Sequence, residues 1–138
     1  MSMPPEAARV LLDKAKGDWR MLQTLERDGE TPVWGIGFHA QQAVEKAIKA
    51  VLCAVGVSFP RTHNIGYLLD LLAAAGHALP PDAPLLPELT VFGSFTRYGD
   101  PAGADPPEED LDRPWALAAV RRTLEWTCQV LNMPRDRD

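Results

Sequence analysis

The sequence predicts an all-α fold, an up-and-down antiparallel bundle of four to five helices in a single domain spanning residues 1–138. Apolar residues recur every three or four positions through several long segments, which is the spacing of helices packed on one side. No segment shows the apolar–polar alternation of a half-buried strand. Proline and glycine lie between the apolar segments, where they start and stop helices.

The first two helices follow from this punctuation. One is expected over residues 6–27, because prolines precede it and an Asp-Gly pair stops the pattern. Thr31 as N-cap and Pro32 at the first helical position predict a second helix, which runs to about Val55 with Gly56 as its C-cap. At about 100° per residue, its core face comprises Ile36, Ala40, Ala43, Val44, Ala47, Ile48, Val51, Leu52 and Val55.

Two shorter apolar segments follow. A helix is expected over about 64–75, capped by Ser58 or Thr62 and ended by Gly76. Another is expected over 85–95, begun or interrupted at a proline.

The last helix begins near Pro114 and places apolar residues at spacings of three and four. Before it, residues 99–112 contain prolines and acidic side chains with almost nothing to bury, so we expect a mobile loop. The C-terminal tail is expected to fray.

Composition excludes several functional classes. The net charge of −5 argues against broad DNA binding and against binding to anionic membranes, both of which need a basic face. There is no run of about 18 apolar residues, so no membrane span is expected. The N-terminus resembles no secretion signal, and Cys53 and Cys128 show no metal-ligand spacing. We therefore expect a cytoplasmic protein with reduced thiols, no metal and no cofactor.

A polar row lies opposite the core face of the second helix: His39, Gln42, Lys46 and Lys49. Gln41 and Glu45 are four residues apart, as are Glu45 and Lys49, so pairing on the helix surface accounts for part of it. Three interpretations stay open: a solvated face, a contact with another subunit, or donors for a phosphate or nucleotide.

Two later segments add candidate site residues. PRTHN places Arg61 and His63 in a tight loop before a helix N-terminus, whose backbone N–H groups would attract an anion. TRYGD places Arg97, Tyr98 and Asp100 after an apolar helix. The alternative is structural: each arginine pairs with a carboxylate and fixes its loop, and His63 belongs to a helix-capping turn.

FHAQQAVEKAIKAVL, followed by RTHNIGYLLDLL and then RYGD, resembles the HEPN family of small helical domains over most of the chain. The resemblance implies a helical bundle that dimerises, and a frequent partnership with a minimal nucleotidyltransferase as a toxin–antitoxin-like pair. It also implies nucleotide binding in some members and metal-independent ribonuclease activity in many others.

The ribonuclease branch carries an arginine followed, after four to six residues, by a histidine, and this chain lacks that motif. Arg97 has no histidine downstream, and a single residue separates Arg61 from His63. The RYPD-like signature is present with Gly99 in place of proline. We therefore do not transfer ribonuclease activity, which stays open as an alternative with His63 or His39 as the base.

The resemblance implies a partner and ligand-binding module for a nucleotide or an RNA phosphate, with a small nucleotidyltransferase as partner. Arg61 and Arg97 would bind phosphate, Tyr98 would stack on a base or accept a nucleotidyl group, and Asp100 would orient an arginine. The expected site, converging on one groove, is His39, Lys46, Arg61, His63, Arg97, Tyr98 and Asp100. A non-catalytic dimeric adaptor and an unrelated helical adaptor remain alternatives.

Overall fold

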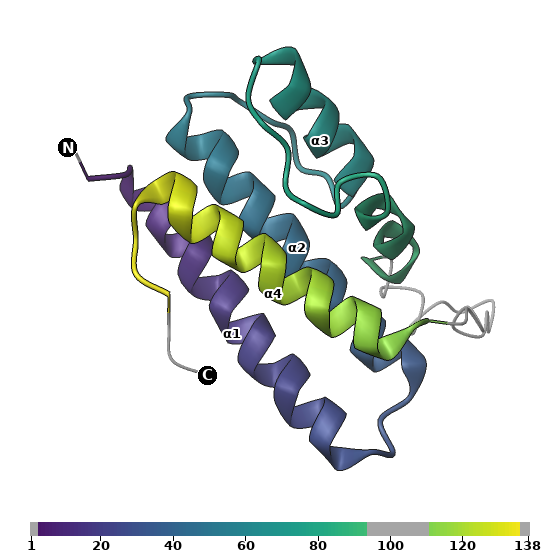
Figure 1. The fold of residues 1–138 in the computed structure, drawn as a ribbon. Coiled ribbons are helices and arrows are strands. Elements are labelled where there is room, and N and C mark those ends of the chain that lie inside the picture. The colour runs from purple at the N-terminus through teal and green to yellow at the C-terminus, as the bar shows by residue number, and fades with distance from the viewer. Residues whose placement is uncertain (1–2, 94–110, 136–138) are drawn as a thin grey trace.

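The computed structural model describes residues 3–93 and 111–135, and within these ranges every regular element is helical (Figure 1). The elements in chain order are α1 (Glu6–Asp28), α2 (Val33–Ala54), α3 (Ile65–Ala74), the 3₁₀ helix η1 (Leu86–Gly93) and α4 (Arg113–Leu131). The predicted all-α bundle is confirmed. Within the same ranges, no helix has the length and hydropathy needed to cross a membrane.

Helix α2 is the central element of the bundle. It contacts α1, α3, η1 and α4, and more than half of its 22 residues are buried. In Figure 1, α1 runs antiparallel to both α2 and α4, and these three long helices pack against one another. Helix α3 and η1 pack against α2 on the side away from α1. Because all four other elements pack on α2, the side chains on the surface of α2 determine where those elements lie.

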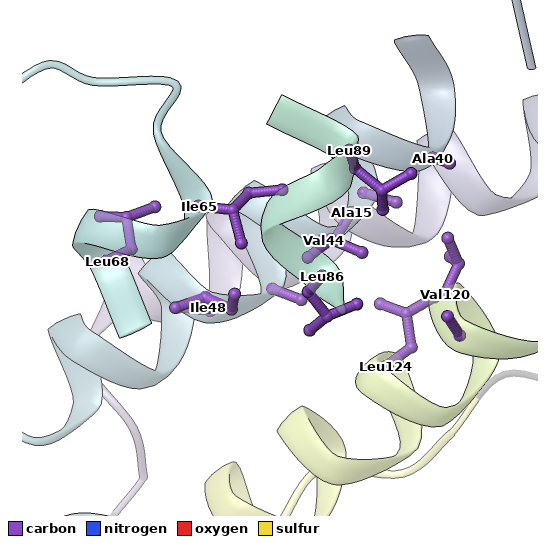
Figure 2. Packing of buried hydrophobic residues seen from close by; sticks show 14 of the residues in the cluster. Ala15, Ala40, Val44, Ile48, Ile65, Leu68, Leu86, Leu89, Val120 and Leu124 are labelled. Atoms are coloured by element: carbon purple, nitrogen blue, oxygen red, sulfur yellow. The ribbon is translucent and has the colours of Figure 1, made fainter. Parts of the chain in front are cut away.

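The core is apolar and continuous across all five elements. Figure 2 shows Ile48 and Val44 of α2 pointing toward Ile65 of α3, Leu86 of η1 and Val120 of α4. All five side chains are fully buried. Of the nine residues predicted for the core face of α2, eight are buried and Val55 is 40% exposed. Val55 is the C-cap residue, so the helical periodicity no longer governs where its side chain points.

Helix α2 ends in a Schellman motif. The Val57 N–H donates to the Leu52 carbonyl and the Gly56 N–H donates to the Cys53 carbonyl. Gly56 has a φ of 77°, in the left-handed region that glycine adopts without strain. The C-cap residue is Val55, so Gly56, which was predicted as the C-cap, lies one position after it. The stop itself was predicted at the right place.

The predicted N-caps were wrong for α2 and α3. Pro32, with no side-chain cap, precedes α2. The Thr31 hydroxyl instead donates to the Leu25 carbonyl at 3.1 Å, so it ties the α1–α2 loop to the end of α1. Helix α3 is capped by Asn64, whose side chain accepts from the Tyr67 N–H at 3.0 Å, and not by Ser58 or Thr62. An asparagine adjacent to the helix reaches this N–H directly.

The helix expected over 85–95 is a 3₁₀ helix over Leu86–Gly93. Prolines lie at four of the positions from 80 to 87, and each removes the N–H that an α-helical hydrogen bond needs. Bonds that span three residues form instead, from the Leu85 N–H to the Asp82 carbonyl and from the Glu88 N–H to the Leu85 carbonyl. Arg122 of α4 holds this segment through two bonds to the Asp82 carboxylate, at 2.9 and 3.0 Å.

Part of the predicted loop and tail lies outside the described residues. Asp112, at the end of the predicted 99–112 loop, is the N-cap of α4, and its side chain accepts from the Trp115 N–H at 3.0 Å. Residues 99–110 and 136–138 are not among those that the structure describes.

We predict that Gly37→Ala destabilises the fold although alanine favours helices. An ideal Cβ at Gly37 would lie 2.5 Å from the Phe92 ring, which packs directly on the α2 backbone. Overpacking of this kind costs roughly 1–3 kcal/mol. The matched control is Gly17→Ala in α1, where the nearest atom is 3.9 Å away and helix propensity should add up to about 1 kcal/mol. Urea unfolding of both variants measures the difference, and a stabilised Gly37→Ala would contradict the η1–α2 packing.

Candidate functional site

Glu45 is a carboxylate inside the bundle. It lies in the middle of α2 with only 5% of its side chain exposed, although the sequence pattern placed it in a surface pair. Gln41, one turn earlier, is fully buried. Because an unpaired buried charge is very costly, the partners of Glu45 determine whether this arrangement is stable.

Three donors satisfy the Glu45 carboxylate. Lys49 Nζ donates to Oε2 at 2.9 Å, and Gln41 Nε2 donates to Oε1 at 2.8 Å. His63 Nδ1 also lies 2.8 Å from Oε1. Burial alone would raise the pKa of Glu45, but the hydrogen bonds from Lys49, Gln41 and His63 outweigh it and hold the pKa below its usual value of 4.5. Glu45 is therefore ionised at neutral pH.

His63 is anchored at two points and open on its outer edge. Its ring is bound to Glu45 through Nδ1, and its backbone carbonyl accepts from Gln41 Nε2 at 3.2 Å. The side chain is nevertheless 65% exposed. Arg61, two residues earlier in the same loop, is exposed and has no ion-pair partner within the described ranges. A fixed imidazole and an available guanidinium thus share one short loop.

Gln41 fixes the position of both surrounding segments. Its Nε2 donates to Glu45 and to the His63 carbonyl, while its Oε1 accepts from Gln42 Nε2 at 2.7 Å. On its other side, an ideal Cβ at Gly93 would lie 2.8 Å from the Gln41 amide, so the end of η1 rests on this side chain. The loop that carries His63 and the end of η1 are therefore held by the same residue.

The N-terminus of α3 offers less to an anion than the sequence predicted. The expectation of available backbone N–H groups was wrong at three positions. Asn64 N–H donates to Thr62 Oγ1, Ile65 N–H to Thr90 Oγ1, and Tyr67 N–H to the Asn64 side chain. Caps within the chain satisfy these donors. Any anion recognition here falls to the side chains of the loop.

His39 and Lys46 belong to a different cluster. Both contact Asp18 of α1: Lys46 Nζ lies 2.6 Å from Oδ2, and His39 Nδ1 lies 3.3 Å from Oδ1. Burial would raise the pKa of Asp18, but the hydrogen bonds and charges of His39 and Lys46 lower it overall. Adjacent residues of a helix project about 100° apart, so Lys46 and its neighbour Glu45 face different sides of α2. This cluster joins α1 to α2.

The structure thus separates the predicted site residues. His63 and Arg61 lie in one loop, whereas His39 and Lys46 meet at the α1–α2 contact. The remaining three predicted site residues, Arg97, Tyr98 and Asp100, lie outside the described residues. Within the described ranges, no group of three or more His, Cys, Asp and Glu side chains is arranged to hold a metal ion.

The sequence interpretation missed Gln41 and Glu45 as site residues, although a helical projection contains the signal. Gln41 is seven residues before Ile48 and eleven before Leu52, so it projects between them to within about 20°. Glu45 projects about 20° beyond Leu52, at the edge of the same core arc. Polar residues within a core arc indicate a buried polar network. The i,i+4 spacing of Gln41, Glu45 and Lys49 equally fits pairing on the helix surface, which was the interpretation given to it.

We predict that Glu45→Gln lowers the free energy of unfolding at neutral pH by roughly 1–3 kcal/mol, because Lys49 loses its buried counterion. This decrease in the free energy of unfolding should become smaller at acidic pH. The unfolded carboxyl binds a proton near pH 4.5 and the folded one only at lower pH, so the wild-type advantage is complete above 4.5 and is lost as pH falls through the folded pKa.

Urea unfolding at stepwise lower pH measures this difference. The control is Glu125→Gln, which removes a more exposed carboxylate that also pairs with arginines and should cost at most about 1 kcal/mol. A wild-type advantage over Glu45→Gln that does not change with pH would contradict the assignment.

Comparison with protein families matches the HEPN domain over residues 8–131, a span that contains both carboxylate clusters and the loop between α2 and α3. Comparisons with curated proteins and with solved structures gave no significant match. The family match supports a nucleotide- or RNA-related role in general. Because the matched span covers nearly the whole chain, this protein belongs to the HEPN domain family.

Proposed function

We propose that this chain is a HEPN module that binds a nucleotide or RNA at the loop of Arg61 and His63, with Arg61 contacting the phosphate. The observation that carries the proposal is the anchoring of His63 on the buried Glu45, with 65% of its side chain exposed beside an exposed arginine. A residue whose ring and backbone carbonyl are both held, but whose side chain is open to solvent, is preorganised for a ligand.

The chemistry of the loop suits one phosphate group. The guanidinium of Arg61 presents paired donors that match two phosphate oxygens. Lys49 lies nearby, but its charge is neutralised by Glu45 at 2.9 Å, so Arg61 is the main cation of the loop. With a net charge of −5, the chain is suited to a small local contact and not to extended, sequence-independent coating of a polyanion.

We further propose that the module acts with a small nucleotidyltransferase in a toxin–antitoxin-like pair. Support comes from the family resemblance of FHAQQAVEK, RTHN and RYGD. Copurification from the native cells, followed by identification of the bound protein, tests this part alone. A stable complex with a protein lacking nucleotidyltransferase motifs would contradict it and leave phosphate binding untouched.

Metal-independent RNA cleavage is the second candidate, and the Glu45–His63 contact is the observation that favours it. In this reaction His63 Nε2 would take the proton of a 2′-hydroxyl, whose oxygen attacks phosphorus as the bond to the 5′-oxygen breaks. The leaving 5′-oxygen takes a proton from water, and a 2′,3′-cyclic phosphate remains. Cleavage of RNA in the presence of a chelator, abolished by His63→Ala, would establish it.

We predict that Arg61→Ala weakens binding of ATP and of a short oligouridylate about tenfold, the effect of losing a charge-assisted hydrogen bond. Arg61→Lys should bind both with an affinity between those of wild type and Arg61→Ala, because lysine keeps the charge but loses the paired donors of the guanidinium. Fluorescence anisotropy and calorimetry measure both. The control is Arg121→Ala, which removes an exposed arginine of α4 that lies 4.0 Å from Glu125.

All three variants should unfold within about 0.5 kcal/mol of wild type, because exposed side chains contribute little to stability. Weakened binding in Arg121→Ala equal to that in Arg61→Ala would indicate nonspecific attraction. No binding of either probe by wild type would overturn the proposal.

We also propose a homodimer. Val10 and Met21 of α1 are 44% and 47% exposed and lie eleven residues apart, so they share one stripe of the helix. Light scattering at a protein concentration on the order of tens of micromolar should give twice the chain mass of 15.2 kDa. Met21→Lys should shift it toward a monomer while Met3→Lys, a control before the helix, does not. A monomeric wild type at that concentration contradicts the dimer.

A further inference from the structure

The hydrogen-bond direction at His63 follows from its partner. Neutral imidazole has one N–H donor and one acceptor nitrogen, and the partner of one fixes the role of the other. Nδ1 lies 2.8 Å from Glu45 Oε1. An ionised carboxylate can only accept, so Nδ1 carries the hydrogen and donates it to Glu45.

In the neutral ring, the exposed edge therefore carries a lone pair. Nε2 lies across the ring from Nδ1, on a side chain that is 65% exposed. In the neutral form this nitrogen accepts a hydrogen bond, and phosphate oxygens, which are acceptors too, do not satisfy it. A hydroxyl group does. The best ligand presents a hydroxyl to His63 and a phosphate to Arg61 within one nucleotide.

We infer that His63 Nε2 accepts a hydrogen bond from the ribose 2′-hydroxyl, so that the site prefers ribonucleotides over 2′-deoxyribonucleotides, with Glu45 as the positioning residue. The inference rests on the proposed phosphate binding at Arg61 and adds the specificity-determining contact. The 2′-hydroxyl is the group by which a protein distinguishes RNA from DNA at a given position.

Glu45 is suited to this role because a carboxylate can accept all the donors around it. Lys49 takes Oε2 while Gln41 and His63 share Oε1. An amide at position 45 has one accepting oxygen, which the Lys49 cation attracts most strongly. Its NH₂ group would then face His63 and donate to Nδ1. Glu45→Gln should therefore shift the hydrogen of His63 from Nδ1 to Nε2, removing the outward acceptor.

The binding experiment compares three hexanucleotides of one base: uridylate, 2′-deoxyuridylate and 2′-O-methyluridylate. Wild type should bind the ribose form about five-fold more tightly than the other two, the range expected for one hydrogen bond. The 2′-O-methyl probe keeps the oxygen but replaces the hydroxyl hydrogen with a methyl group, so together with the smaller deoxy probe it tests whether the hydroxyl donates the bond. His63→Ala should bind all three alike, at the deoxy level. Arg61→Ala should weaken binding of all three by a similar factor.

Nuclear magnetic resonance supplies the readout that a purely structural role of Glu45 would not move. The ¹⁵N shifts of the His63 ring, at about pH 8.5 where histidine is usually neutral, should show the Nδ1–H tautomer in wild type. They should show Nε2–H in Glu45→Gln, with loss of the ribose preference. If Glu45→Gln does not fold, the wild-type tautomer and the His63→Ala comparison decide.

The outcomes separate the two proposals. Equal binding of all three hexanucleotides by wild type, or an Nε2–H tautomer in wild type, overturns the ribose inference and leaves phosphate binding at Arg61 standing. Failure of wild type to bind any of them overturns the proposed function and this inference with it. Ribose preference that survives His63→Ala would locate the discrimination elsewhere and also overturns the inference.

Discussion

The need to satisfy one buried carboxylate organises this bundle around α2. Glu45 is buried in the middle of α2, and a charge there is tolerated only if donors surround it. Lys49 comes from the same helix and therefore costs no loop closure. His63 comes from the α2–α3 loop, so the loop must pass over α2 at this point. The path of the chain between two helices is thus set by an electrostatic requirement as much as by apolar contact.

The same requirement extends to η1 through Gln41. Its amide donates twice and accepts once, which leaves little freedom of rotation, and Gly93 packs on it where any larger residue would collide. A fully satisfied polar network in a core specifies one arrangement, because every alternative leaves a group unpaired. The apolar residues of α2 supply most of the burial, and the network fixes the register of the segments laid over them.

The two carboxylate clusters on α2 serve different purposes. Asp18 with Lys46 and His39 joins neighbouring helices of the bundle, as an interhelical ion pair does. Glu45 holds a loop whose histidine remains exposed. The chain lacks the usual ribonuclease spacing, but it still holds a reactive side chain in a fixed position. That side chain is His63 in the loop between α2 and α3, which is both anchored on Glu45 and exposed.

The sequence by itself determined where the helices lie. Period and punctuation are local properties, so the spans of α1, α2, α3 and α4 were predicted to within a few residues, and the family resemblance was recognised from three short motifs. The 3₁₀ form of η1 and the N-caps at Pro32 and Asn64 were missed. Apolar spacing does not distinguish a 3₁₀ helix from an α-helix, and Thr31, Ser58 and Thr62 are as suited to capping by residue type as the residues that precede the helices.

Only the tertiary structure decided the site. Helical projection showed Gln41 and Glu45 near the core arc, but a projection gives a direction and not the group that lies there. Glu45 meets His63 eighteen residues later, and Lys46 meets Asp18 twenty-eight residues earlier. Such pairings depend on how the helices pack, which no local pattern encodes. The structure therefore places His39 and Lys46 at the α1–α2 contact, and Arg61 and His63 in the loop between α2 and α3.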